Sequence, residues 1–277
     1  MHSPAESGAL VVVGDLLEDI VVWATEPIRA ATDSAAQVFR SRGGSAANVA
    51  AHAASRTPTR FIGRVGDDAA GVALVTALAA AGVDVRVQRA GRTGAVVVVV
   101  APDGERTMFP DRASAADLAE VEPGWLDGIA WLHLPCYGLE HEPMRSELHR
   151  LAALAGRRGA RSSVDASSTG LIEGLGVERV RGWIADLAPD VLFANGSEAA
   201  LLGIAGGGDA AVPLAGTVVI KHGPDPTEVY ETGELAARVP VPPVAGVRDL
   251  TGAGDAFAAG WLAARIGGAD ATAACVA

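Results

Sequence analysis

A chain of 277 residues with 49% hydrophobic content is long enough to bury the core of one large α/β domain. Its net charge of −11 and its aromatic content of 4% argue against a nucleic-acid partner, because the chain offers neither a basic stripe nor a set of base-stacking side chains. The cysteines, Cys136 and Cys275, match no metal or redox spacing, and neither a signal-peptide pattern nor an apolar run of membrane-spanning length is present, so we expect a cytoplasmic protein with no membrane partner.

In chain order, short β-branched runs predict strands, and segments rich in alanine and leucine predict helices. A first strand over 10–13 is followed by a mixed, partly alternating segment over 20–42, which indicates exposed sheet. A helix over 45–55, a strand over 60–63 and a helix over 74–81 come next. The segment 94–109 then predicts a hairpin that turns at Asp103-Gly104.

Beyond residue 113 strands and helices alternate, which predicts a parallel sheet covered by helices on both faces. The expected strands are 131–134, 162–165, 191–194, 217–220 and 228–230, and the expected helices are 143–155, 177–187, 197–202 and 253–266. The β-rich segments 15–42 and 91–112 interrupt this rhythm, so we assign them to a small lid. The remainder, 1–14, 43–90 and 113–277, forms the core of one domain.

The segment 249–255, Asp-Leu-Thr-Gly-Ala-Gly-Asp, runs directly into an apolar helix. Small residues at a helix start leave backbone N–H groups uncovered, and the helix dipole favours an anion there. The amides of Gly252, Ala253 and Gly254 therefore predict a site for a phosphate or an oxyanion. Asp255, in the first turn, could accept a proton from a hydroxyl beside that site. The alternative is that Asp255 merely stabilises the helix N-terminus.

A second glycine-rich segment lies near the N-terminus, where 43–48 reads Gly-Gly-Ser-Ala-Ala-Asn and 62–71 reads Ile-Gly-Arg-Val-Gly-Asp-Asp-Ala-Ala-Gly. Together with 249–255, this segment resembles the paired signatures of the ribokinase (PfkB) family of sugar and nucleoside kinases. The resemblance spans residues 10–275. It implies a three-layer α/β/α sandwich with a mostly parallel central sheet and a small β-sheet lid. It also implies transfer of the γ-phosphoryl group of ATP to a sugar hydroxyl with the help of Mg²⁺.

The same resemblance assigns roles on the acceptor side. It implies that Asp255 is the general base, that the amides of 252–255 form the anion hole, and that Asp19, Gly44 and Asn48 hold the sugar. Glycine lets a ligand approach the backbone closely, and an asparagine amide both donates and accepts. The alternatives are that Asp19 is an ordinary solvated acid and that Gly44 and Asn48 serve helix packing.

On the nucleotide side, 195–198 resembles the family's Asn-x-x-Glu element near Mg²⁺ and the phosphates, with glycine at the usually acidic second position. This implies nucleotide contact by Asn195 and a water-mediated magnesium contact by Glu198. Helix capping by the same pair is the alternative. Lys221, the only lysine of the chain, and Gly223 match a nucleotide-side loop, although Pro224-Asp225-Pro226 departs from its usual second glycine.

Thr251 and Asp249 match further family positions, Thr251 beside the nucleotide and Asp249 at a monovalent-cation site, which makes K⁺ a further candidate cofactor. Family members usually continue beyond the segment that corresponds to 267–275 with a helix that walls the adenine pocket. From this comparison we expect a shortened C-terminal segment and a less complete nucleotide site.

The acceptor is least specified by the sequence. Arg106 or Arg112 could meet the carboxylate of a sugar acid, as in 2-keto-3-deoxygluconate kinases, or be solvated on the lid. Asp165 follows a strand beside the expected cleft, and His133 and His141 are expected to be structural. A pentose or hexose is the first expectation. The alternatives are a nucleoside, a sugar acid, a hydroxymethylpyrimidine- or pyridoxal-type substrate, or a non-catalytic binder. Pairing of lids implies a possible homodimer.

Overall fold

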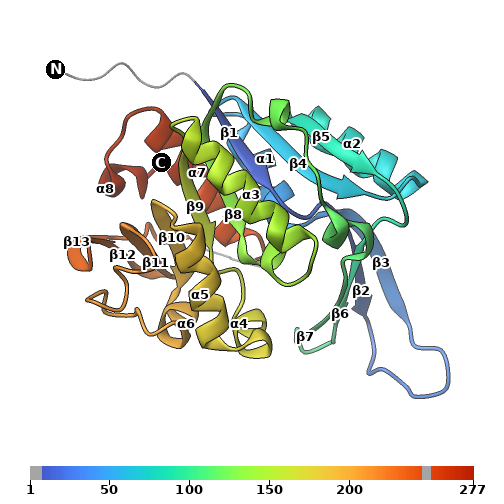
Figure 1. Cartoon of the computed structure of the whole chain (residues 1–277). Helices are drawn as coiled ribbons and strands as arrows, with labels where there is room; N and C mark the ends of the chain where they lie inside the picture. The colour runs from blue at the N-terminus through green and yellow to red at the C-terminus, as the bar shows by residue number, and fades with distance from the viewer. Residues whose placement is uncertain (1–7, 245–250) are drawn as a thin grey trace.

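The computed structural model describes residues 8–244 and 251–277, which form one large sheet covered by helices and a smaller sheet projecting beside it (Figure 1). In spatial order the large sheet contains β13 (Glu234–Val239), β12 (Asp225–Glu231), β11 (Thr217–His222), β10 (Val191–Asn195), β9 (Arg161–Asp165), β8 (Ile129–Pro135), β1 (Ala9–Val13), β4 (Thr59–Val65) and β5 (Asp84–Arg89). The strands from β11 to β5 are parallel, and β12 and β13 add antiparallel at one edge.

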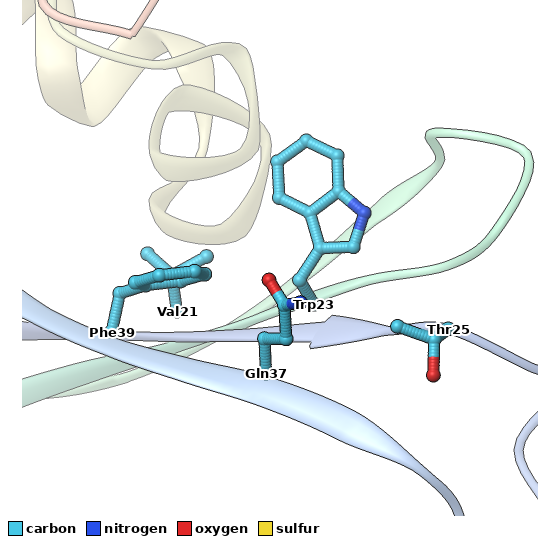
Figure 2. Close-up of a pocket in the computed structure, with 5 residues that line it drawn as sticks. All are labelled: Val21, Trp23, Thr25, Gln37 and Phe39. Atoms are coloured by element: carbon cyan, nitrogen blue, oxygen red, sulfur yellow. The ribbon is translucent and has the colours of Figure 1, made fainter.

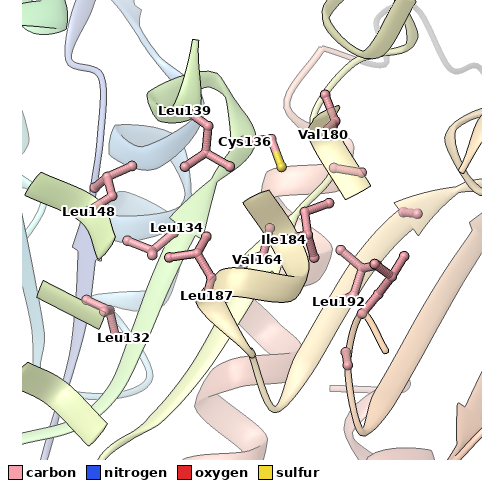
Figure 3. Packing of buried hydrophobic residues seen from close by; sticks show 14 of the residues in the cluster. Leu132, Leu134, Cys136, Leu139, Leu148, Val164, Val180, Ile184, Leu187 and Leu192 are labelled. Atoms are coloured by element: carbon pink, nitrogen blue, oxygen red, sulfur yellow. The ribbon is translucent and has the colours of Figure 1, made fainter. Parts of the chain in front are cut away.

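Two apolar cores lie on the two faces of this sheet because successive strand residues point to opposite sides. On β1, Val11 and Val13 belong to one core, and Leu10 and Val12 belong to the other. Figure 3 shows the first core, where Leu132 and Leu134 meet helix side chains. The helices are α1 (Ser45–Ala53), α2 (Ala69–Ala80), α3 (Met144–Arg157), α4 (Thr169–Leu175), α5 (Val177–Leu187), α6 (Gly196–Leu201), α7 (Ala253–Ile266) and α8 (Ala271–Ala274), with short 3-10 helices at Ala113–Asp117, Pro123–Leu126 and Cys136–Leu139. This is the expected three-layer sandwich.

The small sheet is the lid expected from the sequence. Its spatial order is β3 (Ala36–Gly43), β2 (Leu17–Ala24), β6 (Ala95–Val100) and β7 (Arg106–Asp111). The hairpin predicted around Asp103-Gly104 is confirmed, since β6 and β7 pair antiparallel on either side of it. Strand β2 follows β1 directly, and β3 leads directly into α1, so the lid is anchored where parallel strands end and helices begin. In that position it can contribute side chains to the carboxyl edge of the sheet, where ligands bind in open α/β folds.

Within the described residues, no helix combines the length and hydropathy needed to cross a membrane.

Candidate active site

The Asp255 carboxylate lies between the first turns of α1 and α7. Gly252 caps α7 with φ +75° and ψ 0°, a left-handed conformation that favours glycine. Ser45 Oγ donates to Asp255 Oδ1 at 2.7 Å, and Asn48 Nδ2 donates to Asp255 Oδ2 at 3.0 Å. The two glycine-rich segments, which are far apart in the sequence, therefore meet at one carboxylate.

The surroundings of Asp255 suit a proton acceptor. Burial raises the pKa of its carboxyl above the ordinary value, and the charge of Asp165 acts in the same direction. The hydrogen bonds from Ser45 and Asn48, and the charge of Lys221, oppose that rise in pKa. Burial is the largest of these effects, so the carboxylate is more basic than a solvated aspartate.

A positive charge lies beside the same helix start. A Cβ added to Gly254 would lie 3.3 Å from Lys221 Nζ, so the ammonium group flanks the first turn of α7. Lys221 Nζ donates to Asp165 Oδ2 at 2.9 Å, and both side chains are largely buried. Lys221 and Asp165 come from β11 and β9, which are parallel to β10 between them. The ammonium, the helix dipole and the amides of 252–254 together form a candidate anion site.

On the lid side, Asp19 is half-buried on β2 and lies against Gly43 at the end of β3. A Cβ on Gly43 would lie 2.1 Å from Asp19 Oδ1, and a Cβ on Gly44 would lie 2.3 Å from the carbonyl oxygen of Asp15. Gly44 also has φ +95°, so a side chain at this position would be both strained and obstructed. Burial raises the pKa of Asp19, and the nearby charge of Arg42 opposes that rise in pKa.

Arg42 completes this side of the site and was missed by the sequence analysis. Its Nη1 donates to Asn48 Oδ1 at 3.0 Å, on the opposite side of the amide from the Asp255 contact. Ser45 was also missed, although it lies within the quoted glycine-rich segment. The available signal was position, since a charged side chain immediately before Gly43-Gly44 must lie near whatever those glycines approach.

The lid arginines are engaged with groups of this chain. Arg112, which follows β7, pairs with the buried Asp15, and its Nε lies 3.2 Å from Glu140 Oε2. Its guanidinium also stacks on Tyr137, 4.6 Å from the ring centroid. Arg106 Nη1 donates to Thr251 Oγ1 at 2.8 Å, which connects the lid to the turn before α7. A contact between Arg112 and a substrate carboxylate stays a prediction.

Asn195 and Glu198 form a capping box at the start of α6. Asn195 Oδ1 accepts from the Glu198 N–H at 2.9 Å, and Glu198 Oε2 accepts from the Asn195 N–H at 2.8 Å. The capping interpretation is therefore confirmed. Glu198 is buried, and burial raises the pKa of its carboxyl. Its magnesium contact through water stays a prediction, and Asp249 lies outside the described residues.

Gly223 lies in the two-residue turn between β11 and β12, with φ +63°. The pairing of His222 with Asp225 closes this turn, so Pro224 occupies its second position. The turn follows Lys221 directly and therefore lies at the same sheet edge as the candidate anion site. Nucleotide contact by Gly223, Asn195 and Thr251 stays a prediction. Among residues 8–244 and 251–277, no three histidine, cysteine or acidic side chains form a metal-binding group.

Comparison with protein families decides what this arrangement belongs to. Residues 8–277 match the family described as pfkB family carbohydrate kinase. The chain belongs to this family. A PfkB kinase transfers a phosphoryl group from ATP to a hydroxyl of a sugar or nucleoside, so the glycine-rich segments and Asp255 lie in the part of the fold where that transfer is expected.

Individual relatives support the same assignment. A fructokinase from Klebsiella pneumoniae is 31% identical over 273 residues, covering 93% of this chain and 84% of the relative. An ATP-dependent ribose-1-phosphate kinase from Halopiger xanaduensis is 34% identical over 238 residues, covering 81% and 73%. The structure of Arabidopsis thaliana ribokinase complexed with ribose and ATP has a TM-score of 0.79 at 22% identity, covering 97% and 89%, which shows the shared fold. The relatives differ in acceptor, so the family does not name it.

Proposed function

We propose that this PfkB kinase phosphorylates a neutral sugar, a pentose or hexose, with Asp255 as the general base. The observation that carries the proposal is the meeting of Asp255 and Lys221 at the first turn of α7. There a basic carboxylate and a cationic anion site lie side by side. A hydroxyl held between them could lose its proton to Asp255 and receive the phosphoryl group of an ATP molecule whose phosphate is bound at the anion site.

In the proposed reaction the acceptor oxygen forms a bond to the γ-phosphorus of ATP as the bond from that phosphorus to the β-γ bridging oxygen breaks. The hydroxyl proton goes to Asp255, and ADP leaves with the electron pair of the broken bond. The amides of 252–254 and the Lys221 ammonium offset charge on the transferring group. Ser45 and Asn48 hold the Asp255 carboxylate in place while it accepts the proton.

The candidate anion site at the start of α7 offers a cation and backbone amides to a phosphate of the nucleotide. Gly254 lacks a Cβ where one would approach Lys221 Nζ, so its side of the anion site stays open to a phosphate. When bound, Mg²⁺ would neutralise phosphate charge. Glu198 would hold it through water, because both oxygens of this carboxylate already accept from Asn195.

The pairing of the arginines supports a neutral acceptor. Arg112 is balanced by Asp15 and Glu140, and the charge of Arg42 interacts with Asp19 and Asp255. A carboxylate or phosphate on the acceptor would compete with those acids for the same guanidinium groups. Asp19, half-buried beside Gly43, instead offers acceptor oxygens that suit two sugar hydroxyls.

A nucleoside is the second candidate, because an apolar groove runs along the lid. Figure 2 shows Phe39 against Val21, then Gln37 beside Trp23, and Thr25 at one end of the groove. In β2 the residues 19, 21 and 23 share one face of the strand, so the groove continues from Asp19. A base attached to a ribose at Asp19 could stack on these rings.

The lid also supports a proposed homodimer. Its exposed large apolar side chains include Val38 at 60%, Phe39 at 53%, Met108 at 58% and Phe109 at 57% exposure. Of these, Val38 and Phe109 share the face of the small sheet opposite the groove, and a second copy of the chain could cover that face. The oligomeric state in solution tests this proposal.

The decisive experiment is Mg-ATP turnover with sugars, sugar acids and nucleosides, using wild type, Asp255→Asn and Asp33→Asn. Asp33, an exposed lid-loop residue, is the matched control. We expect acceptor-dependent ADP release by wild type and the control, with kcat lower by roughly 10²–10⁴-fold in Asp255→Asn. Equal rates in all three proteins would contradict the role of Asp255. ATP binding without turnover on any acceptor would instead support a non-catalytic binder.

A further inference from the structure

Arg42, on the lid strand β3, is linked to the candidate base Asp255 through one intervening side chain, Asn48. It lies near the end of β3, one residue before the Gly43-Gly44 turn into α1. Its Nη1 donates to Asn48 Oδ1 at 3.0 Å, and Asn48 Nδ2 donates to Asp255 Oδ2 at 3.0 Å. A continuous chain of two hydrogen bonds therefore runs from the Arg42 guanidinium on the lid, through the Asn48 amide, to the Asp255 carboxylate on α7.

The chemistry of the three groups allows one orientation of the amide. A guanidinium has only donors, and an ionised carboxylate has only acceptors. Asn48 must therefore turn its oxygen to Arg42 and its nitrogen to Asp255. With the amide reversed, its oxygen would face a carboxylate and its nitrogen would face a cation. Arg42 thus provides a physical reason for the Asn48 amide to donate to Asp255.

We propose that Arg42 is a positioning residue, which acts through Asn48 to aim the Asp255 carboxylate and to keep it charged before the acceptor arrives. Its catalytic meaning rests on the proposed function of Asp255 as the base.

The electrostatic surroundings of Asp255 explain why a further cation matters. From α1 it accepts hydrogen bonds from Ser45 and Asn48. Lys221 on β11 stabilises its charge, and Asp165 on β9 destabilises it. Arg42 interacts through its charge with Asp19 on β2 as well as with Asp255.

Burial lowers the pKa of Arg42, and the charges of Asp19 and then Asp255 oppose that fall in pKa. The guanidinium therefore places a positive charge near both carboxylates. Without Arg42, burial and the charge of Asp165 still raise the pKa of Asp255, and only Lys221 and the neutral donors Ser45 and Asn48 oppose that rise. The pKa of Asp255 should therefore rise further when Arg42 is neutralised.

The test is the ionisation of Asp255 itself, which requires no acceptor and no turnover. Protein labelled with carbon-13 at the aspartate carboxyl carbons is titrated by NMR, and Asp255→Asn identifies the resonance. Arg42→Gln should raise the titration midpoint of Asp255, and Arg42→Lys should raise it less, because lysine keeps the charge but not the fork. Arg40→Gln is the matched control, since Arg40 lies two residues earlier and pairs with Glu18 at the surface, and it should leave the midpoint unchanged.

An unchanged midpoint in Arg42→Gln would overturn the proposal. If that variant does not fold, Arg42→Met, which also removes the charge and the donors, decides in the same way, because an unchanged midpoint there would also overturn it. In kinetics, Arg42→Gln should lower kcat about 10- to 100-fold, as expected for a displaced reacting group, and leave KM for ATP unchanged. A protein that phosphorylates nothing would refute the kinase proposal, while the titration would still report on Arg42.

Discussion

The buried histidine of β8 makes the stability of this fold sensitive to acid. His133 is fully buried, and its Nδ1 lies 2.8 Å from Ser163 Oγ. Its Nε2 has no hydrogen-bond partner in the described part of the chain. Burial lowers the pKa of His133 to about 4 from an ordinary value of 6.5. We therefore expect His133→Leu to remove a defined part of the acid sensitivity.

The direction and size follow from proton linkage. The folded state resists protonation of His133, so its contribution to stability is complete above pH 6.5 and is lost as the pH falls from 6.5 towards 4. The difference between the two pKa values corresponds to about 3 kcal/mol in full, of which about 2 kcal/mol is lost between pH 7 and pH 5.

Urea unfolding at pH 7 and pH 5 measures this loss. The free energy of unfolding of wild type should fall by about 2 kcal/mol more than that of His133→Leu over this interval. In the variant Ser163 Oγ still accepts from Trp131 Nε1, and its O–H still has the Leu132 carbonyl oxygen at 3.5 Å as an acceptor. The same pH dependence in both proteins would refute the reasoning, because it would mean that His133 gains its proton without unfolding.

Two further outcomes are expected. Arg112→Gln should lower the free energy of unfolding by about 3 kcal/mol, because Asp15 is buried and would lose its cation. Adding Asp15→Asn to the same chain should recover part of that loss. A large rise in acceptor KM with unchanged stability would instead support a substrate contact by Arg112. Sedimentation equilibrium should give twice the mass of one chain if the lids pair, and the mass of a single chain at all micromolar concentrations would contradict the homodimer.

The elements that sequence reasoning located best are those whose local pattern and tertiary role agree. The helix expected over 253–266 is observed as Ala253–Ile266, and the helix expected over 177–187 is observed as Val177–Leu187. In both, the apolar face and the start signal point to the same boundaries. The fold followed from the alternation of such elements, as the parallel pairing of the central strands confirms.

The elements that were missed have weak local patterns. Strand β5 (Asp84–Arg89) alternates charged and apolar residues at a sheet edge, and β13 (Glu234–Val239) is an exposed edge strand. Their pairing partners determine their conformation more than their own residues do. The short helix α4 (Thr169–Leu175) is similarly too brief to show a helical period.

The site was predicted as a set of motifs, but its connections were not. Sequence spacing cannot indicate that Arg42 donates to Asn48, or that Lys221 pairs with Asp165, because these contacts depend on where the lid and separate strands lie in space. For Asn195 and Glu198 the spacing did predict a contact, but it did not decide between two roles. Their spacing matched both a capping box and a nucleotide element, and the capping hydrogen bonds do not exclude a metal contact through water.

The charges of the candidate active site bear on both the nucleotide and the acceptor of the proposed reaction. The carboxylates described at the site outnumber the cations. The carboxylates are Asp15, Asp19, Glu140, Asp165, Glu198 and Asp255, and the cations are Arg42, Arg106, Arg112 and Lys221. A bare polyphosphate would meet net repulsion there, so in the proposed reaction the helix dipole of α7 and a bound magnesium ion would supply the missing positive charge. A neutral sugar adds no charge to that balance, whereas an anionic acceptor would draw Arg42 or Arg112 away from its present partners. The excess of carboxylates over cations at the candidate site is thus the physical reason to favour a neutral acceptor.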